Sequence, residues 1–302
     1  MIAKRGTGTI VVLVTEERFR MVRANNLSGS GGANQAYVLG HSDQELARLN
    51  EQARIVEPIT RRFFGDAGLV SGMRVLDVGS GAGEVSFLAA DLVGDTGTIV
   101  GVDRASAAVE VARARAIASG RRNVSFREGD LAEMKFDEPF DAVIGRFVLV
   151  FQNDPAAMLT KLAKHVRPGG LMVFHEIDLE GCQSFPPSPV YDSCCRWLRQ
   201  TIRLLGLDPR MGMKLHSAFV SAGLPVPTLR LEAVIGGGTN SLDSVRLAAE
   251  VVPILLSEIL RLGVATAAEI GVETLTERMI NEAISNDSVI VGRLEIGAWC
   301  RV

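Results

Sequence analysis

The segment Val75–Gly83 reads Val-Leu-Asp-Val-Gly-Ser-Gly-Ala-Gly, so a short apolar run leads directly into three alternating glycines. A helical pattern follows, and a second apolar run, 98–102, then ends at Asp103. A buried strand, a glycine turn, a helix and a second strand ending in a carboxylate are how a parallel α/β sheet builds a pocket for an adenosine-containing ligand. A purely structural strand-to-helix turn is the alternative for the glycines taken alone.

Three carboxylates narrow the identity of this ligand. Glu84 stands where a dinucleotide fingerprint needs its third glycine, and its charge would repel a pyrophosphate at the start of the next helix. Asp77 lies two residues before the first glycine and suits an ammonium group, whereas Asp103 can hold both hydroxyls of a ribose. S-adenosylmethionine carries an ammonium, a ribose and a sulfonium and has no phosphate, so we expect it to be the cofactor.

Composition excludes several classes of partner. The 302 residues are 47% hydrophobic with a net charge of −3, and their basic residues cluster only in short pairs such as Arg61-Arg62, so we expect no nucleic-acid partner. The longest apolar stretch, near 245–262, is broken by charges and Pro253, so no membrane span is expected. The four cysteines lack C-x-x-C spacing and the apolar run 10–14 is too short for a signal peptide. These features predict a cytoplasmic protein with reduced thiols.

Apolar runs alternate with helical patterns along the middle of the chain. Such alternation predicts a parallel sheet with helices on both faces. The predicted strands are 74–78, 98–102, 124–128, 140–145 and 171–176, with helices at 84–93, 106–119 and 155–165. Two later strands, 228–235 and 289–299, separated by helices around 242–262 and 267–284, would complete a seven-stranded core.

Composition also divides the chain into five segments. Residues 1–36 end in a Gly/Ser-rich run and are expected to form a flexible extension. Homo-oligomerisation through this arm or through the apolar helix 242–262 is a further hypothesis. The remaining segments are a helical lid at 37–66 with one helix from Ser42 and another from Pro58, a cofactor-binding core at 67–179, a helical cap at 180–228, and a C-terminal part at 229–302 that completes the sheet.

Five segments in chain order resemble the motifs of the class I S-adenosylmethionine-dependent methyltransferases. They are 75–83, 100–104, 128–131, 140–150 and 162–174, the last containing Arg-Pro-Gly-Gly. The resemblance covers roughly residues 37–180 and is closest to the small-molecule branch with the ubiquinone/menaquinone-type and natural-product methyltransferases. It implies a Rossmann-like α/β fold with a seven-stranded, mostly parallel sheet, an N-terminal helical lid and an inserted helical cap.

The resemblance also implies which residues hold the cofactor. Gly79 and Gly81 would approach its methionine part, Asp77 would orient the ammonium through water, and Asp103 would take the ribose hydroxyls. Asp130 would accept from the adenine amino group.

Four more positions belong to this implied cofactor site. The Leu131 amide would reach the adenine ring, and Arg104 departs from the commoner apolar residue at its position. Arg146, at the end of the fourth strand, would face the region where cofactor and substrate meet. Tyr37 resembles a lid residue that stabilises the sulfonium, with ordinary helix packing as the alternative.

Methyl transfer from a sulfonium is an in-line displacement that depends mainly on alignment and exclusion of water, so a general base is optional. His175 and Glu176 follow the fifth strand, and alternation sends them to opposite faces. We favour Glu176 over His175 as a base, with His41 on the lid as a third candidate and a structural hydrogen-bonding role as the alternative. No metal-ligand spacing is present, so a magnesium-dependent mechanism is not expected.

The sequence thus predicts an enzyme that methylates carbon or oxygen of a hydrophobic small molecule. The same fold and cofactor could instead serve a non-methylating cyclisation or decarboxylation, or a non-catalytic regulator that binds the cofactor. The bulky cap residues have two interpretations: they line an apolar substrate chamber, or they pack in the core. These residues are Phe185, Tyr191, Trp197, Met211, Met213 and Phe219.

Overall fold

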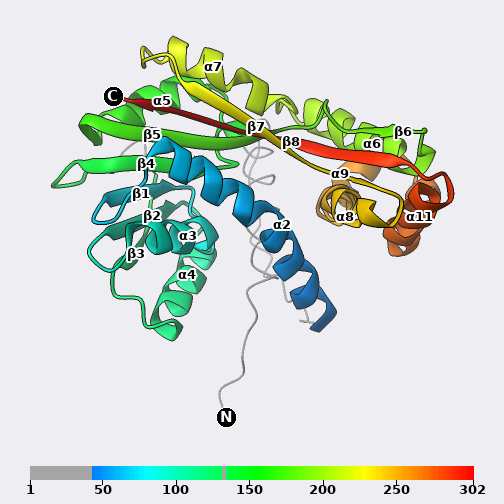
Figure 1. The fold of residues 1–302 in the computed structure, drawn as a ribbon, viewed down its shortest axis with the longest axis horizontal. Helices are drawn as coiled ribbons and strands as arrows, with labels where there is room; N and C mark the ends of the chain where they lie inside the picture. The colour runs from blue at the N-terminus through cyan, green and yellow to red at the C-terminus, as the bar shows by residue number, and fades with distance from the viewer. Residues whose placement is uncertain (1–42, 131–133) are drawn as a thin grey trace, which may run out of the picture.

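The computed structural model describes residues 43–130 and 134–302, with side chains from residue 55 onward. The predicted extension 1–36 lies outside these residues. One sheet organises the fold (Figure 1), with the strand order β3-β2-β1-β4-β5-β8-β6 and β7 on the other side of β8. The first five strands are parallel, as predicted, and they are β1 (Arg74–Val78), β2 (Thr98–Asp103), β3 (Val124–Glu128), β4 (Phe140–Arg146) and β5 (Val166–Asp178).

Alternation along these strands supplies two cores, one on each face of the sheet. Val75 and Ile144 pack with helices on one face, whereas Leu76 and Val143 pack on the other. The first face is covered by α2 (Asp43–Ala67), α3 (Glu84–Val93) and α4 (Ser106–Ala118), and the second by α5 (Pro155–Ala163) and α7 (Met211–Ser221). Because both faces are covered, the carboxyl ends of the parallel strands are left to build a site.

The antiparallel end of the sheet depends on the long strand β8 (Val289–Arg301). It pairs with β5 through residues 294–301, and with the short β6 (Gln183–Phe185) through residues 289–291. On its other side it pairs with β7 (Thr228–Gly237). The sheet therefore has eight strands where seven were predicted. The additional strand is β6, which pairs with the first residues of β8, beyond the part of β8 that pairs with β5.

Five helices form a third hydrophobic core beyond the sheet, which we call the helical lobe (Figure 1). Here α6 packs against α9 and α11, which lie beside the far end of β8. The lobe comprises α6 (Pro189–Leu204), α8 (Leu242–Ala249), α9 (Val251–Arg261), α10 (Ala267–Ile270) and α11 (Val272–Ser285).

This grouping differs from the cap expected at 180–228. Only α6 of that segment joins the lobe, whose other helices come from the segment that was expected only to complete the sheet. Helix α7 instead packs on β5 and β8, with Leu215 and Phe219 in the core of the sheet. Gly212 permits this close approach, because a Cβ there would lie 2.5 Å from Ile296.

Three helix boundaries differ from those predicted. One continuous helix, α2, runs through Pro58, where the sequence predicted a new start. The predicted helix 242–262 is split at Glu250, and the predicted helix 267–284 is split at Gly271, which has φ +53°. None of the helices in the described ranges is long and apolar enough to cross a membrane.

Candidate functional site

The glycine loop joins β1 to α3 at the carboxyl edge of the sheet. Gly79 and Gly81 have φ of +64° and +55°, in the left-handed region that other residues rarely adopt. The Ser80 amide donates to Val102 O at 3.0 Å and ties the loop to β2. The chain therefore turns tightly and exposes backbone, rather than side chains, at these two glycines.

Asp103 holds this loop in place. Its Oδ2 accepts from the Gly81 amide at 2.9 Å and its Oδ1 accepts from the Ala105 amide at 3.0 Å. The carboxylate is buried at the end of β2. The structure thus brings together the first glycine motif and the distant aspartate that the sequence paired with it.

Two serines accompany the loop. The Ser86 hydroxyl donates to Asp77 Oδ2 at 2.5 Å, which fixes the buried Asp77 carboxylate to the first turn of α3. Ser80 Oγ is buried and has no hydrogen-bond partner in the described part of the chain. A buried hydroxyl without a partner costs free energy, so this atom is a natural contact for a bound polar group.

Asp130 lies beyond β3 at the far end of the same edge. Its Oδ2 accepts from Arg104 Nη2 at 2.7 Å, and the two side chains are 40% and 50% exposed. Arg104 stands where an apolar residue is commoner, and its ion-pair partner is Asp130, the residue predicted to contact adenine. The neighbouring Leu131, like Tyr37 and His41, lies outside the described residues.

Glu84 begins α3 and is not a lone charge. Its Oε1 accepts from Arg115 Nη1 at 2.7 Å, and the same guanidinium nitrogen donates to Ala82 O. Because Arg115 neutralises much of the Glu84 charge, Glu84 repels a phosphate less strongly than the sequence suggested. Arg115 was missed because it lies 31 residues further along the chain, on α4.

His175 lies in what we call the charge cluster, formed by Thr60, Arg146, His175, Arg293 and Glu295 between α2 and strands β4, β5 and β8. His175 Nδ1 lies 3.1 Å from the Thr60 hydroxyl and its Nε2 lies 2.8 Å from Glu295 Oε2. Burial lowers the pKa of His175, so the imidazole is neutral at pH 7 and donates through Nε2 to the Glu295 carboxylate.

Glu295 is the anion of this charge cluster. Its Oε1 accepts from Arg293 Nε at 2.7 Å. Burial opposes its ionisation, but the charge of Arg293 and the hydrogen bond from His175 outweigh burial and lower the pKa of Glu295 to about 2. The sequence-based prediction did not include Arg293 or Glu295. A signal was present, because these two charges stand at alternate positions of the apolar strand 289–299 and therefore lie on one face.

Glu176 points away from this charge cluster, as strand alternation predicted. Its Oε1 accepts from the amides of Val148 and Leu149 at 2.8 and 2.6 Å, at the start of the short helix η1 (Leu149–Phe151). The buried carboxylate thereby fixes the segment that follows β4. In the described structure, His175 and Glu176 both make hydrogen bonds to protein groups that position the sheet edge.

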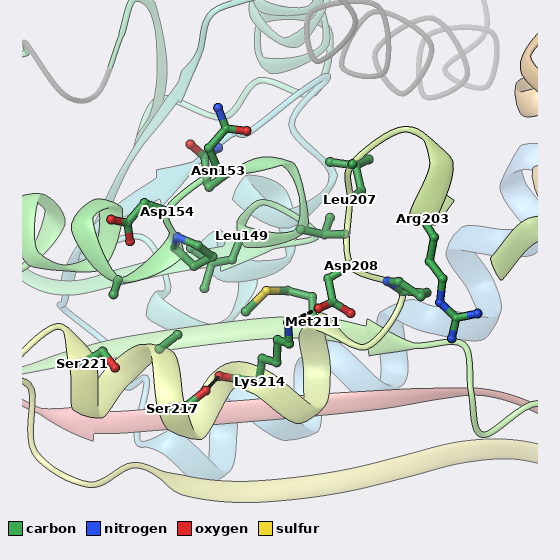
Figure 2. A pocket seen from close by; sticks show the side chains of 17 residues that line it. Leu149, Asn153, Asp154, Arg203, Leu207, Asp208, Met211, Lys214, Ser217 and Ser221 are labelled. Atoms are coloured by element: carbon green, nitrogen blue, oxygen red, sulfur yellow. Dashed lines mark hydrogen bonds and ion pairs between the residues drawn. The ribbon is translucent and has the colours of Figure 1, made fainter. Parts of the chain in front are cut away.

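A cavity of about 600 Å³ lies beyond η1, between the start of α5 and the connection from α6 to α7 (Figure 2). Leu149 and Met211 give it a buried apolar floor, and the ion pair of Asp208 and Lys214 stands at its wall. Of the bulky cap residues, only Met211 lines this cavity. Phe185 and Met213 are exposed, whereas Tyr191, Trp197 and Phe219 are packed in the cores.

The family model described as "Methyltransferase domain" matches residues 69–207. A probable cobalt-precorrin-6B C(15)-methyltransferase (decarboxylating) from Sulfolobus acidocaldarius is 32% identical over 146 residues, covering 47% of this chain and 73% of that protein. The chain belongs to the class I S-adenosylmethionine-dependent methyltransferases. Its glycine loop and Asp103 lie inside the matched region.

Two further relatives of this class I methyltransferase match over shorter shares of their length. An arsenite methyltransferase from Aquipseudomonas alcaligenes is 34% identical over 132 residues, 39% of this chain and 38% of that protein. The aklanonic acid methyltransferase DauC from Streptomyces sp. is 36% identical over 118 residues, 39% of this chain and 54% of that protein. The chain therefore spans about half the length, or less, of these relatives.

The residues of this methyltransferase fit the cofactor of its family. Asp77, Asp103 and Asp130 offer carboxylates along one sheet edge, which suits the ammonium, ribose hydroxyls and adenine amino group of S-adenosylmethionine. The buried Ser80 hydroxyl adds a polar contact in the loop between them. In the described ranges, no group of three His, Cys, Asp or Glu side chains is arranged to hold a metal ion.

Proposed function

We propose that this methyltransferase binds S-adenosylmethionine along the carboxyl ends of β1, β2 and β3 and transfers its methyl group to a hydrophobic small molecule. The Gly81–Asp103 hydrogen bond carries the proposal, because it joins the open glycine loop to the carboxylate that would hold a ribose. Gly79 and Gly81 would lie against the methionine part and Asp77 would orient the ammonium.

The adenine end of the proposed site is formed by Asp130, and a contact from the Leu131 amide remains a prediction. Arg104 shares the Asp130 carboxylate, and one carboxylate oxygen can accept from the adenine amino group while the other stays with Arg104. Tyr37 and His41 remain predictions for a lid over the sulfonium.

Bound S-adenosylmethionine supplies an electrophilic methyl group and a neutral thioether leaving group. The chain's own contribution is alignment and the exclusion of water. His175 is neutral and its ring nitrogens face Thr60 and Glu295, and Glu176 accepts from two amides, so we assign both as positioning residues. Transfer to carbon or oxygen then depends on the acceptor, which is a small molecule as it is for the relatives named for arsenite and aklanonic acid.

The acceptor side of the proposed site lies toward α2 and the helical lobe. Strand β5 leads directly into the segment before α6, and α8 packs against β7, β8 and α2. The four cysteines are free thiols, which agrees with a reducing compartment, and a cytoplasmic location is part of the same proposal.

Calorimetry with S-adenosylhomocysteine tests the cofactor assignment. Asp130→Ala removes the proposed adenine acceptor and is expected to weaken binding about tenfold, the effect of one hydrogen bond. Arg104→Gln is the matched control, because it breaks the same ion pair and leaves the carboxylate available to adenine. Equal losses in the two variants would contradict the adenine contact, and no binding by the wild type would refute the cofactor assignment.

Turnover is tested separately with S-adenosylmethionine labelled on its methyl group. The label is expected to move to members of a panel of apolar phenols and acids only when the protein is present. Binding of S-adenosylhomocysteine without any transfer across such a panel would favour the non-catalytic regulator instead.

A further inference from the structure

Arg146 has no ion-pair partner among the described residues. Its guanidinium is partly buried at the end of β4 and donates to the Thr60 hydroxyl at 3.1 Å. No carboxylate of the described residues lies within 4.0 Å of its nitrogens. Burial lowers the pKa of Arg146, which reflects the cost of holding this cation away from water.

The other charges of the charge cluster are already balanced. Arg293 and Glu295 form an ion pair at 2.7 Å, and both side chains are buried. His175 is neutral and occupies the second Glu295 oxygen. The charge cluster as a whole therefore has one excess positive charge, which belongs to Arg146.

Phe147 connects the two guanidiniums. The carbon of the Arg146 guanidinium lies 5.6 Å from the centre of its ring and that of Arg293 lies 5.1 Å from it. Phe147 has φ +55°, a conformation rare for a bulky residue, and its amide donates to His175 O at 2.9 Å. Such strain persists only where surrounding contacts hold it, and it collects at ligand sites.

The direction of Arg146 indicates which ligand it faces. Its contacts lie on α2 and, through the charge cluster, on β5 and β8, which are on the opposite side of β4 from β1, β2 and β3. The proposed cofactor contacts Asp77, Asp103 and Asp130 all belong to the latter strands or follow them. The charges of Glu84 and Asp77 also act on Arg146, so it lies where the cofactor side and the acceptor side meet, with its hydrogen-bond contact on the acceptor side.

We propose that the methyl acceptor carries a carboxylate and that Arg146 binds it, so that this methyltransferase acts on acidic, otherwise apolar small molecules. A guanidinium presents paired N–H donors that match a carboxylate, and a partly buried site strengthens the contact. The acid would supply the negative charge that the charge cluster lacks. This inference rests on the proposed function, because it names the class of acceptor for the same site.

The cofactor also contains a carboxylate, in its methionine part, and the experiment separates the two sources. S-adenosylhomocysteine retains this carboxylate, whereas methylthioadenosine lacks the whole amino-acid group. If Arg146 binds the acceptor, Arg146→Gln leaves the affinities for both compounds at the wild-type value. A loss for S-adenosylhomocysteine alone would assign Arg146 to the cofactor and overturn the proposal.

The second part of the experiment tests the acceptor and uses protein saturated with S-adenosylhomocysteine. Its probes are two matched pairs, 2-naphthoate with 2-naphthamide and octanoate with octanamide. Calorimetry is expected to show that the acids bind the wild type about tenfold more tightly than the amides, and that Arg146→Gln abolishes this preference. Arg146→Lys keeps the positive charge and is expected to retain part of the preference for acids. Arg196→Gln, at an exposed arginine on α6, is the control and should match the wild type.

Three results would overturn the inference. They are equal binding of acids and amides by the wild type, no binding of either acid, and an acid preference that survives Arg146→Gln. Unchanged affinity for S-adenosylhomocysteine shows that each variant is folded. A wild type that does not bind S-adenosylhomocysteine would instead refute the proposed function, so the two failures are distinguishable.

Discussion

The two halves of the proposed site are built in opposite ways. On the cofactor side, Asp77 and Asp103 lie in β1 and β2 and Asp130 follows β3, and Asp130 also pairs with the exposed Arg104. On the acceptor side, the charge cluster joins Thr60 to Glu295 through His175, and its buried side chains come from three separate elements, α2, β5 and β8. The cofactor half is therefore local and partly open to water, whereas the acceptor half depends on the complete tertiary structure.

Substitution of Glu295 should give the largest effect and would test this contrast directly. Glu295→Ala leaves Arg293 buried without its carboxylate, so we expect a loss of about 3–5 kcal/mol in the free energy of unfolding. Asp130→Ala on the cofactor side is the matched comparison, with an expected loss of less than about 1 kcal/mol. Denaturant unfolding followed by circular dichroism measures both, and similar losses would erase the distinction between the halves.

Acid should weaken the acceptor half in a defined range of pH. Because the pKa of Glu295 falls from 4.5 to about 2 on folding, its ionised form stabilises the protein fully above pH 4.5 and progressively less as the pH falls toward 2. This group accounts for at most about 3 kcal/mol. Unfolding free energies from pH 6 to 2 should fall less steeply for Glu295→Gln than for the wild type, and identical slopes would contradict the assigned pKa.

Asp103 should give an intermediate effect on stability. Asp103→Ala leaves the Gly81 and Ala105 amides without their acceptor, with an expected loss of about 1–3 kcal/mol in the free energy of unfolding. Asp103→Asn retains one acceptor oxygen and should lose less. If the alanine variant were as stable as the wild type, the glycine loop would not depend on this carboxylate.

The smallest effect is expected at the open ion pair. Arg104→Gln removes a half-exposed partner of Asp130 and should change the free energy of unfolding by no more than about 1 kcal/mol. Any change should shrink in high salt, because salt screens exposed charges. A larger loss that does not depend on salt would show that this side of the site is as tightly coupled as the charge cluster.

The same contrast explains what could be predicted from the sequence. The strand, glycine turn, helix and Asp103 lie within about thirty residues, and their spacing alone predicted how they meet. The sequence could not show that Glu295 reaches His175, because this contact depends on β8 pairing with β5 across 120 residues. It likewise placed α7 in the cap, since periodicity identifies a helix and not the surface it covers.

Strand β8 also has a consequence for how the molecule is made. It pairs with β5 and β7 in the sheet and contacts α8 of the helical lobe. It also supplies Arg293 and Glu295 to the charge cluster. During synthesis, β1 to β5 and the helices between them emerge from the ribosome more than one hundred residues before residues 289–301. Contacts between such distant segments form slowly. A nascent chain therefore acquires the elements of its cofactor loop early, and its acceptor side stays unfinished until this late strand has been translated and inserted.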